Sequence, residues 1–267
     1  MWFVQQTHLE VGQGLGLCDK EVVVSLPDRI AVWLCEQLTS AGADGFVCGL
    51  SGGVDSATAV ALAVQAVGPE HVLAVLMPCH SQPEDAVLGR LVADTFSIPT
   101  LTVDLSPAYD ALSAQLPPDS QPDGLAAANI KPRLRMTTLY YLAQSRNYLV
   151  LGSGNRTELA VGYFTKYGDG GVDLLPLGGL YKTQVWNLAR ELGVPLEVIE
   201  RPPSAGLWPG QTDEGEMGIT YRELDRVLAA IEKGDVSGVE PSMLEKVRRM
   251  ISRSAHKRIM PPTFRVD

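Results

Sequence analysis

Six consecutive residues, Ser51 to Ser56 (SGGVDS), have the types needed to hold a phosphate. Two adjacent glycines let backbone N–H groups turn inward around an anion, and a following helix adds the positive end of its dipole. The two serines add hydroxyl donors. An aspartate would repel a bare phosphate, so Asp55 indicates a Mg²⁺ ion between carboxylate and phosphate. The alternative is a tight strand–helix turn in which Ser or Asp caps the helix. We predict a phosphate loop whose contacts are Ser51, Gly52, Gly53, Asp55 and Ser56.

This loop matches neither of two common nucleotide-binding patterns. The sequence has no Gly-Lys-Ser/Thr, which excludes a Walker A loop, and no Gly-x-Gly-x-x-Gly after a strand. The glycine-dense stretch Gly12–Gly16 is wrongly spaced and follows no convincing strand.

Strand-like and helix-like segments alternate around this loop. Gly45–Leu50 is a short apolar run typical of a buried strand, and Ser56–Val67 carries the small aliphatic residues of a helix packed closely on a sheet. Such alternation favours right-handed crossovers, so we predict an α/β fold, a doubly wound parallel sheet with helices on both faces. The other predicted strands are Glu21–Val24, His71–Met77, Pro99–Leu105 and Tyr148–Gly152, and the other predicted helices are Asp28–Leu38, Pro83–Phe96, Arg133–Asn147, Tyr221–Lys233 and Pro241–Ser252.

Two segments interrupt the alternation. Leu116–Gly124 is rich in Pro, Asp and Ser, which predicts an exposed loop. Arg201–Gly218 is too long for an ordinary connection, and long loops in compact domains are usually functional or disordered. Trp208 within it favours docking onto the protein.

Composition places bounds on the protein. The chain has 267 residues, of which 45% are hydrophobic and 20% charged, and this composition excludes a disordered tail protein. Its net charge of −9 disfavours a general nucleic-acid binder. No apolar run approaches the roughly 20 residues that span a bilayer, and the N-terminus lacks the pattern of a signal peptide. The four cysteines are too widely spaced for a structural zinc site. We therefore expect a soluble, cytoplasmic protein with no membrane or nucleic-acid partner.

The hexapeptide resembles the Ser-Gly-Gly-x-Asp-Ser pyrophosphate loop of the N-type ATP pyrophosphatases, which adenylate an oxygen of a second substrate. Three further blocks resemble the NAD synthetase family: Asn129–Thr137, Leu151–Thr183 and Pro203–Gly218, followed by His256-Lys257-Arg258 near Pro261-Pro262. The resemblance covers roughly Pro27 to Pro262. It implies an adenine nucleotide alpha-hydrolase-like fold, with residues 1–26 as an N-terminal arm and residues 27–267 as a single domain.

The implied reaction is ATP-dependent amidation of deamido-NAD by ammonia, which releases AMP and pyrophosphate. The resemblance pairs Glu158 with Asp55 as Mg²⁺ ligands and directs Lys182 to the phosphates. Each has a structural alternative: Glu158 could be an acid that favours the start of a helix, and Lys182 a solvent-exposed helix lysine. Ser153 and Ser204 fall at family positions near ATP.

Further positions match the family's deamido-NAD site. Asp169 is the candidate for holding ammonium and accepting its proton, although a turn-forming role before Gly170 is the alternative. For His256 and Lys257 the alternative is a surface basic C-terminus. The candidates for binding the substrate are Arg135, Tyr140, Tyr163, Lys166, Asp169, Asp173, His256 and Lys257.

One feature departs from the family pattern. The family commonly has an arginine after the strand that ends here at Met77-Pro78, whereas this chain has Cys79-His80, and its nearest arginine is Arg90. Either His80 takes over that contact or ATP is recognised differently. The resemblance also implies a homodimer, for which the helix Arg133–Asn147 is one candidate contact. We expect no glutaminase domain in this chain, and a separate glutaminase partner is left open.

Two other classes of function compete with this one. A tRNA-thiolating enzyme would need a basic RNA surface and a reactive cysteine pair, neither of which is visible. A nucleotide-binding sensor without catalysis is disfavoured because every candidate phosphate and metal group is retained.

Overall fold

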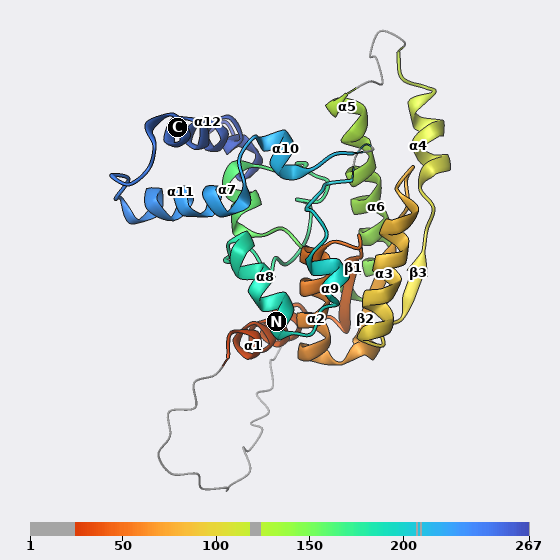
Figure 1. The fold of residues 1–267 in the computed structure, drawn as a ribbon. Coiled ribbons are helices and arrows are strands. Elements are labelled where there is room, and N and C mark those ends of the chain that lie inside the picture. The colour runs from red at the N-terminus through yellow and green to blue at the C-terminus, as the bar shows by residue number, and fades with distance from the viewer. Residues whose placement is uncertain (1–24, 118–123, 207, 209, 267) are drawn as a thin grey trace, which may run out of the picture.

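The computed structural model describes residues 25–117, 124–206, 208 and 210–266, and its centre is a parallel sheet (Figure 1). The strands are β1 (Gly45–Gly49), β2 (Val72–Leu76), β3 (Thr100–Thr102) and β4 (Tyr148–Leu151), in the spatial order β3-β2-β1-β4. All three pairings are parallel. The chain adds β2 and β3 on one side of β1 and then places β4 on the other, which is the reversal that defines a doubly wound sheet.

Helices cover both faces of this sheet (Figure 1). One core joins α1, α2, α3, α8 and α9 to Phe46 and Cys48 of β1, whereas a second joins α6 to Val47 of the same strand. Side chains of β1 therefore alternate between two apolar layers, which is why its sequence is a continuous apolar run. The helices are α1 (Leu26–Ala41), α2 (Val54–Val67), α3 (Pro83–Thr95), α4 (Ser106–Ser113), α5 (Leu125–Ala128), α6 (Ile130–Arg146), α7 (Arg156–Val161), α8 (Lys182–Glu191), α9 (Leu196–Ile199), α10 (Asp213–Met217), α11 (Tyr221–Lys233) and α12 (Pro241–Arg253), with 3₁₀ turns η1 (Pro69–His71) and η2 (Ala255–Lys257).

A third apolar cluster lies to one side of the sheet. It joins α7, α10, α11 and α12 through residues such as Val161, Leu224 and Val247. Figure 1 shows these helices as a group beside α8. Because α7 belongs to this group and Trp186 of α8 packs against it, these two helices connect the group to the segments that follow β4.

The predicted fold class is confirmed, and every predicted element within the described residues is present. The predicted strand Glu21–Val24 lies outside the described residues. β3 is three residues long, shorter than the predicted Pro99–Leu105. Arg201–Gly218 is not all loop, because α10 forms within it, with the Thr212 hydroxyl accepting from Gly215 N. Trp208 is 42% exposed, so it does not anchor that loop by burial. The described part of Leu116–Gly124 is exposed, as predicted.

No helix in the described part of the chain combines the length and apolar character needed to cross a lipid bilayer.

Candidate active site at the carboxyl ends of β1 and β4

The candidate phosphate loop lies where the strand order reverses. Ser51 follows β1 and Asn155 follows the neighbouring β4, so both segments leave the same edge of the parallel sheet. A crevice at this position is where ligands bind in open α/β sheets. Topology therefore predicts that the segments after β1 and β4 act together.

The loop is closed by its own hydroxyl groups. The Oγ atoms of Ser51 and Ser56 lie 3.0 Å apart, Ser51 N donates to Ser56 Oγ at 3.2 Å, and Gly53 N donates to Ser51 Oγ at 3.3 Å. Gly52 has φ +78°, and a Cβ atom there would lie 2.6 Å from the Asp85 carbonyl oxygen. Only glycine fits that turn without displacing α3.

Lys182 brings the two predicted metal carboxylates together. Its Nζ forms an ion pair with Asp55 and lies 3.4 Å from Glu158 Oε1. The lysine is 1% exposed, although it begins α8 and could equally have pointed to solvent. The plain reading of Lys182 as a solvated helix lysine is therefore wrong.

Burial and mutual charge shift the pKa values of this cluster. Burial, with the neighbouring Asp55 carboxylate adding to it, raises the pKa of Glu158 to about 8. Burial opposes the charge on Lys182, but Asp55 and Glu158 together outweigh it and raise the lysine pKa above its usual value. The lysine therefore keeps its proton while the carboxylates compete for one cation.

A third buried carboxylate, Asp213, faces the same cluster from α10. It is 4% exposed, and burial raises its pKa. The Tyr221 hydroxyl lies 2.9 Å from Asp213 Oδ2 and 3.3 Å from Glu158 Oε1. Oδ1 of Asp213 has no hydrogen-bond partner among the described residues.

These donors fit a divalent cation. Two carboxylates contact one ammonium group, a third acts on its charge from nearby, and one buried oxygen of that third carboxylate is left without a hydrogen. No set of three His, Cys, Asp or Glu side chains within the described residues is arranged to hold an ion alone. Mg²⁺ typically takes one or two protein carboxylates and completes its shell with substrate phosphates and water, which is the donor set that Asp55 and Glu158 offer.

Asp169 lies in a second, mainly cationic group formed by residues 162–169 and the C-terminal segment. Its Oδ1 accepts from Thr165 N at 2.9 Å, and partial loss of hydration raises its pKa although the Lys257 charge acts in the opposite direction. Lys257 Nζ donates to the carbonyls of Gly162 and Phe164 at 2.8 and 2.7 Å. The Asp169 side chain therefore closes the turn that begins at Thr165, and the residue lies exposed at the surface near Lys257.

Tyr163 and Lys166 belong to this second group. Lys166 Nζ donates to the His256 carbonyl oxygen at 2.6 Å, which connects the block 163–169 to the C-terminal segment. The Tyr163 hydroxyl donates to Glu216 Oε2 at 2.8 Å, and burial and the nearby Asp213 raise its pKa. Tyr163 therefore joins the second group to the carboxylate cluster.

Tyr140 and Asp173 contact each other on the α6 side of the sheet. The Tyr140 hydroxyl donates to Asp173 Oδ1 at 3.0 Å, and Asp173 Oδ2 accepts from Val150 N at 2.8 Å. Burial and then the Asp173 contact raise the pKa of Tyr140 to about 12. No hydrogen bond joins this pair to Lys182 or Asp169 in the described structure.

Arg135 reaches the loop that follows β2. Its Nε donates to the Met77 carbonyl and its Nη2 to Ser81 Oγ, each at 3.2 Å. Asp85 and Asp169 both act on its charge, while burial lowers its pKa overall. An arginine from α6 therefore lies where the chain lacks the expected arginine after β2.

His80 and Arg90 point elsewhere. His80 Nε2 lies 2.8 Å from Asp110 Oδ1 of α4, and Arg90 Nη2 donates to Thr102 Oγ1 of β3 at 3.2 Å. Arg90 therefore does not substitute for the missing arginine.

Ser153 and Ser204 lie on loops at the same edge. Ser153 is half-buried directly after β4, and Ser204 Oγ accepts from Gly206 N at 3.1 Å. The loop that carries Ser204 is tied to α3 by the ion pair between Arg201 and Asp85, at 2.5 Å. Asp85 also supplies the carbonyl that lies against Gly52.

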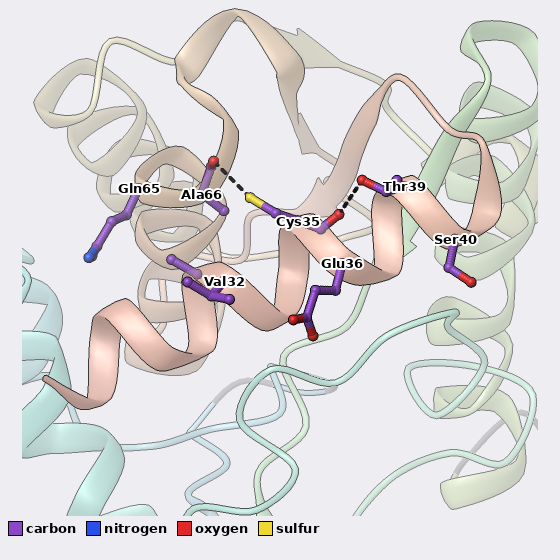
Figure 2. A pocket seen from close by; sticks show the side chains of 8 residues that line it. Val32, Cys35, Glu36, Thr39, Ser40, Gln65 and Ala66 are labelled. Carbon is purple, nitrogen blue, oxygen red and sulfur yellow. Dashed lines mark hydrogen bonds between the residues drawn. The ribbon is translucent and has the colours of Figure 1, made fainter. Parts of the chain in front are cut away.

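The groove drawn in Figure 2 lies away from this edge. It is lined by residues of α1, including Val32, Cys35 and Glu36, and by Gln65 and Ala66 of α2. Cys35 Sγ donates to the Ala66 carbonyl at 3.1 Å. Because α2 begins beside the phosphate loop, these residues lie at its far end, about 17 Å along the helix axis. The groove contains none of the candidate site residues.

Sequence reasoning missed several polar residues of the site. Asn155 had a readable signal, since it stands three residues before Glu158 as in a capping box, and both reciprocal contacts are present. Asp213, Glu216, Tyr221 and the pair Asp85–Arg201 had none, because only the fold brings Tyr221 to Glu158, Glu216 to Tyr163 and Arg201 to Asp85.

The chain is similar to known proteins over most of its length. The family model described as NAD synthase matches residues 26–261. A protein from Carboxydothermus hydrogenoformans, named NH(3)-dependent NAD(+) synthetase, is 50% identical over 88% of this chain and 94% of its own. The solved structure of NMN synthetase from Francisella tularensis has a TM-score of 0.81 at 38% identity, over 90% of this chain and 98% of that chain. NH3-dependent NAD synthetase from Campylobacter jejuni has a TM-score of 0.77 at 26% identity, over the same shares of the two chains.

Proposed function

The chain belongs to the NAD synthase family, and from this we propose that the crevice between the ends of β1 and β4 is its catalytic centre. The reaction of this family is ATP-dependent amidation of deamido-NAD by ammonia, and the protein is accordingly a ligase that forms a C–N bond. The main support for a catalytic centre in this crevice is the buried Lys182 ammonium, which lies against Asp55 and Glu158 beside the phosphate loop.

In the first half-reaction, a carboxylate oxygen of the pyridine acid attacks the α-phosphorus of ATP, and the bond to pyrophosphate breaks. Negative charge is spread over the phosphoryl oxygens in the transition state. The N–H groups of residues 51–56 and the start of α2 bind the departing pyrophosphate. The Ser51 and Ser56 hydroxyls give up the hydrogen bond between them and donate to phosphate oxygens instead. The Lys182 ammonium neutralises negative charge on the phosphoryl oxygens.

Asp55 and Glu158 would hold Mg²⁺, with Ser153 and Ser204 binding ATP from the adjoining loops. When bound, the ion supplies neutralisation of phosphate charge. The Lys182 ammonium lies against the same two carboxylates, so a bound ion would add the second positive charge that Asp55 and Glu158 lack.

In the second half-reaction, ammonia attacks the acyl carbon and AMP leaves with the electron pair of the broken C–O bond. Asp169 binds ammonium through its carboxylate and accepts the proton, so that the nitrogen lone pair becomes available. The neighbouring cations Lys166 and Lys257 favour the anionic substrate, and Tyr163 offers an aromatic face to its pyridinium ring. The remaining predicted substrate contacts are Arg135, Tyr140, Asp173 and His256.

The decisive experiment is identification of the product by mass. Purified protein with deamido-NAD, ATP, Mg²⁺ and ammonium should form NAD, AMP and pyrophosphate in equal amounts. Replacing ammonium by glutamine alone should stop the reaction, which tests the stand-alone use of ammonia against dependence on a glutaminase partner. ATP cleavage without NAD formation would contradict the proposal.

A mononucleotide substrate is the second candidate, because one solved relative at 38% identity is named NMN synthetase. The same chemistry would then act on the deamido form of that mononucleotide. Comparing kcat/KM for the dinucleotide and mononucleotide acids in one assay decides between them, and we expect the dinucleotide to be preferred.

We also propose one catalytic unit over residues 27–267, a cytoplasmic location and a homodimer. The first follows because α11 packs on α7 and α8, which carry Glu158 and Lys182. The Tyr141 side chain on α6 is 73% exposed, which makes this helix a candidate dimer contact. Light scattering of the parent and of Tyr141→Lys tests the homodimer and this contact. A monomeric parent would exclude the homodimer, and a dimeric Tyr141→Lys would exclude the contact.

A further inference from the structure

A buried carboxylate outside the reaction centre ties together the two helices that carry its charged groups. Asp225 lies on α11 and is 6% exposed. It forms no ion pair in the described part of the chain. Burying a carboxylate costs free energy unless its oxygens accept hydrogen bonds, so the stability of Asp225 in this position depends on its hydrogen-bond donors.

Both oxygens of Asp225 bind segments next to the catalytic groups. Oδ1 accepts from the Thr157 hydroxyl at 2.5 Å, and Oδ2 accepts from Thr183 N at 2.9 Å. The Thr157 hydroxyl in turn accepts from Lys182 N at 3.0 Å. Three hydrogen bonds therefore join α7, α8 and α11, two of them to the Asp225 carboxylate and one to the Thr157 hydroxyl.

These contacts satisfy the free N–H groups at the start of α8. The first residues of a helix have no intrahelical acceptor, and here Lys182 N binds Thr157 while Thr183 N binds Asp225. A negative charge at this point also complements the helix dipole. The backbone of Lys182 is thereby fixed relative to α7.

The same network fixes Glu158. Thr157 directly precedes Glu158 in the first turn of α7, so anchoring the threonine hydroxyl sets where the Glu158 side chain begins. The distance between the Lys182 and Glu158 charges therefore depends on a residue that contacts neither side chain.

We propose that Asp225 is a positioning residue, which holds Lys182 and Glu158 in register for transfer of the adenylyl group. This inference rests on the proposed function. Misplacing reacting groups by about 1 Å can cost about 100-fold in rate. Because the charge is needed most in the transition state, the loss should fall on kcat rather than on the KM for ATP.

The test measures pyrophosphate release with deamido-NAD, ATP, Mg²⁺ and ammonium. Asp225→Ala should lower kcat about 100-fold while changing the KM for ATP less than about threefold. Asp225→Asn keeps an acceptor for Thr183 N and should lie within about tenfold of the parent. The matched control is Leu228→Ala, which empties a buried position on the same helix without touching this network.

A double-mutant cycle adds a second readout. Thr157→Val removes the hydroxyl and keeps the side-chain shape, so its effect on kcat should not add to that of Asp225→Ala. Thr157→Val and Leu228→Ala should be additive. If Asp225→Ala does not fold, Thr157→Val and Asp225→Asn carry the test.

The outcomes separate this inference from the function. A parent protein that makes no pyrophosphate overturns the proposed function and this inference with it. An active parent, with Asp225→Ala and Leu228→Ala equally active at matched fractions of folded protein, overturns the positioning role alone. A selective loss of kcat with recovery in Asp225→Asn supports it.

Discussion

The side-chain amide of Asn155 donates to Asp55 Oδ1 at 2.9 Å, although the two residues are 100 positions apart. Asn155 also caps α7, where its side chain accepts from Glu158 N and its own N–H donates to Glu158 Oε2. One neutral side chain thus orients both candidate metal carboxylates. Orienting groups of this kind are usually worth 10- to 100-fold in metal affinity or activity.

Asn155→Ala should therefore weaken Mg²⁺ use more than stability. We expect the Mg²⁺ concentration for half-maximal pyrophosphate release to rise about tenfold, with a loss of about 1 kcal/mol in unfolding free energy. Thr220→Ala is the matched control, because Thr220 caps α11 at an exposed position. Equal Mg²⁺ dependence in the two variants would show that Asn155 acts only as a cap.

Asp55→Asn should abolish most adenylation while the protein stays folded. The Lys182 ammonium keeps Glu158 as a counter-ion, but the charge that balances the metal is lost. We expect pyrophosphate release to fall at least about 100-fold, with an unchanged circular dichroism spectrum. Asp94→Asn, on the exposed side of α3, serves as control. Full turnover at saturating Mg²⁺ would remove Asp55 from the ligand set.

Gly52→Ala should distort the phosphate loop. Its φ of +78° disfavours any Cβ, and that atom would lie 2.6 Å from the Asp85 carbonyl oxygen. We expect a lower melting temperature and a raised KM for ATP. At Gly179 an added Cβ meets nothing within 4 Å, so Gly179→Ala should leave both quantities near the parent values. Similar KM values in both variants would argue against a role for the turn in binding ATP.

The ion pair between Arg201 and Asp85 should act on ATP binding through the loop that carries Ser204. Arg201→Ala is expected to raise the KM for ATP with little change in kcat, because a looser loop weakens binding before chemistry begins. The reversed pair, Asp85→Arg with Arg201→Asp, should recover part of the loss in a double-mutant cycle. No coupling between the two positions would contradict this link.

Asp169 should set a pH-dependent limit on activity and stability. Partial loss of hydration of its carboxylate raises its pKa above 3.8, so the folded protein holds this proton more tightly than the unfolded chain. This contribution to stability therefore grows as pH falls through the folded-state pKa, and it is lost as pH rises above it. The residue is exposed, so solvent screens this effect, and Asp169→Asn should be only slightly more stable than the parent at pH 7, with the difference shrinking in acid.

The rate should respond in the opposite sense, because the ionised Asp169 carboxylate is the form that accepts a proton. The acid limb of the kcat profile should lie above pH 3.8, and it should be absent from the residual activity of Asp169→Asn. An unchanged limb in that variant would assign it to another group.

Local patterns in the sequence were enough for the fold class and for the phosphate loop. The strand and helix segments follow from apolar spacing over a few residues, and the loop is six contiguous residues whose types alone indicate an anion. Several helices were not predicted: α5 and α9 have only four residues, too few to complete an amphipathic repeat, and the longer α4 and α8 were also missed. The role of Gly52 in turning the backbone could also be predicted, since its positive φ is a property of the loop itself.

Only the tertiary structure decided how the charged groups combine. Lys182 and Asp55 are 127 positions apart, and Asp225 and Thr157 are 68 apart, so no spacing in the sequence records their contact. They meet because parallel strands deliver successive loops to one edge of the sheet, and because α11 packs on both α7 and α8. A lysine at a helix start looks solvated in sequence. Its burial against two carboxylates depends on which segments the sheet places beside it.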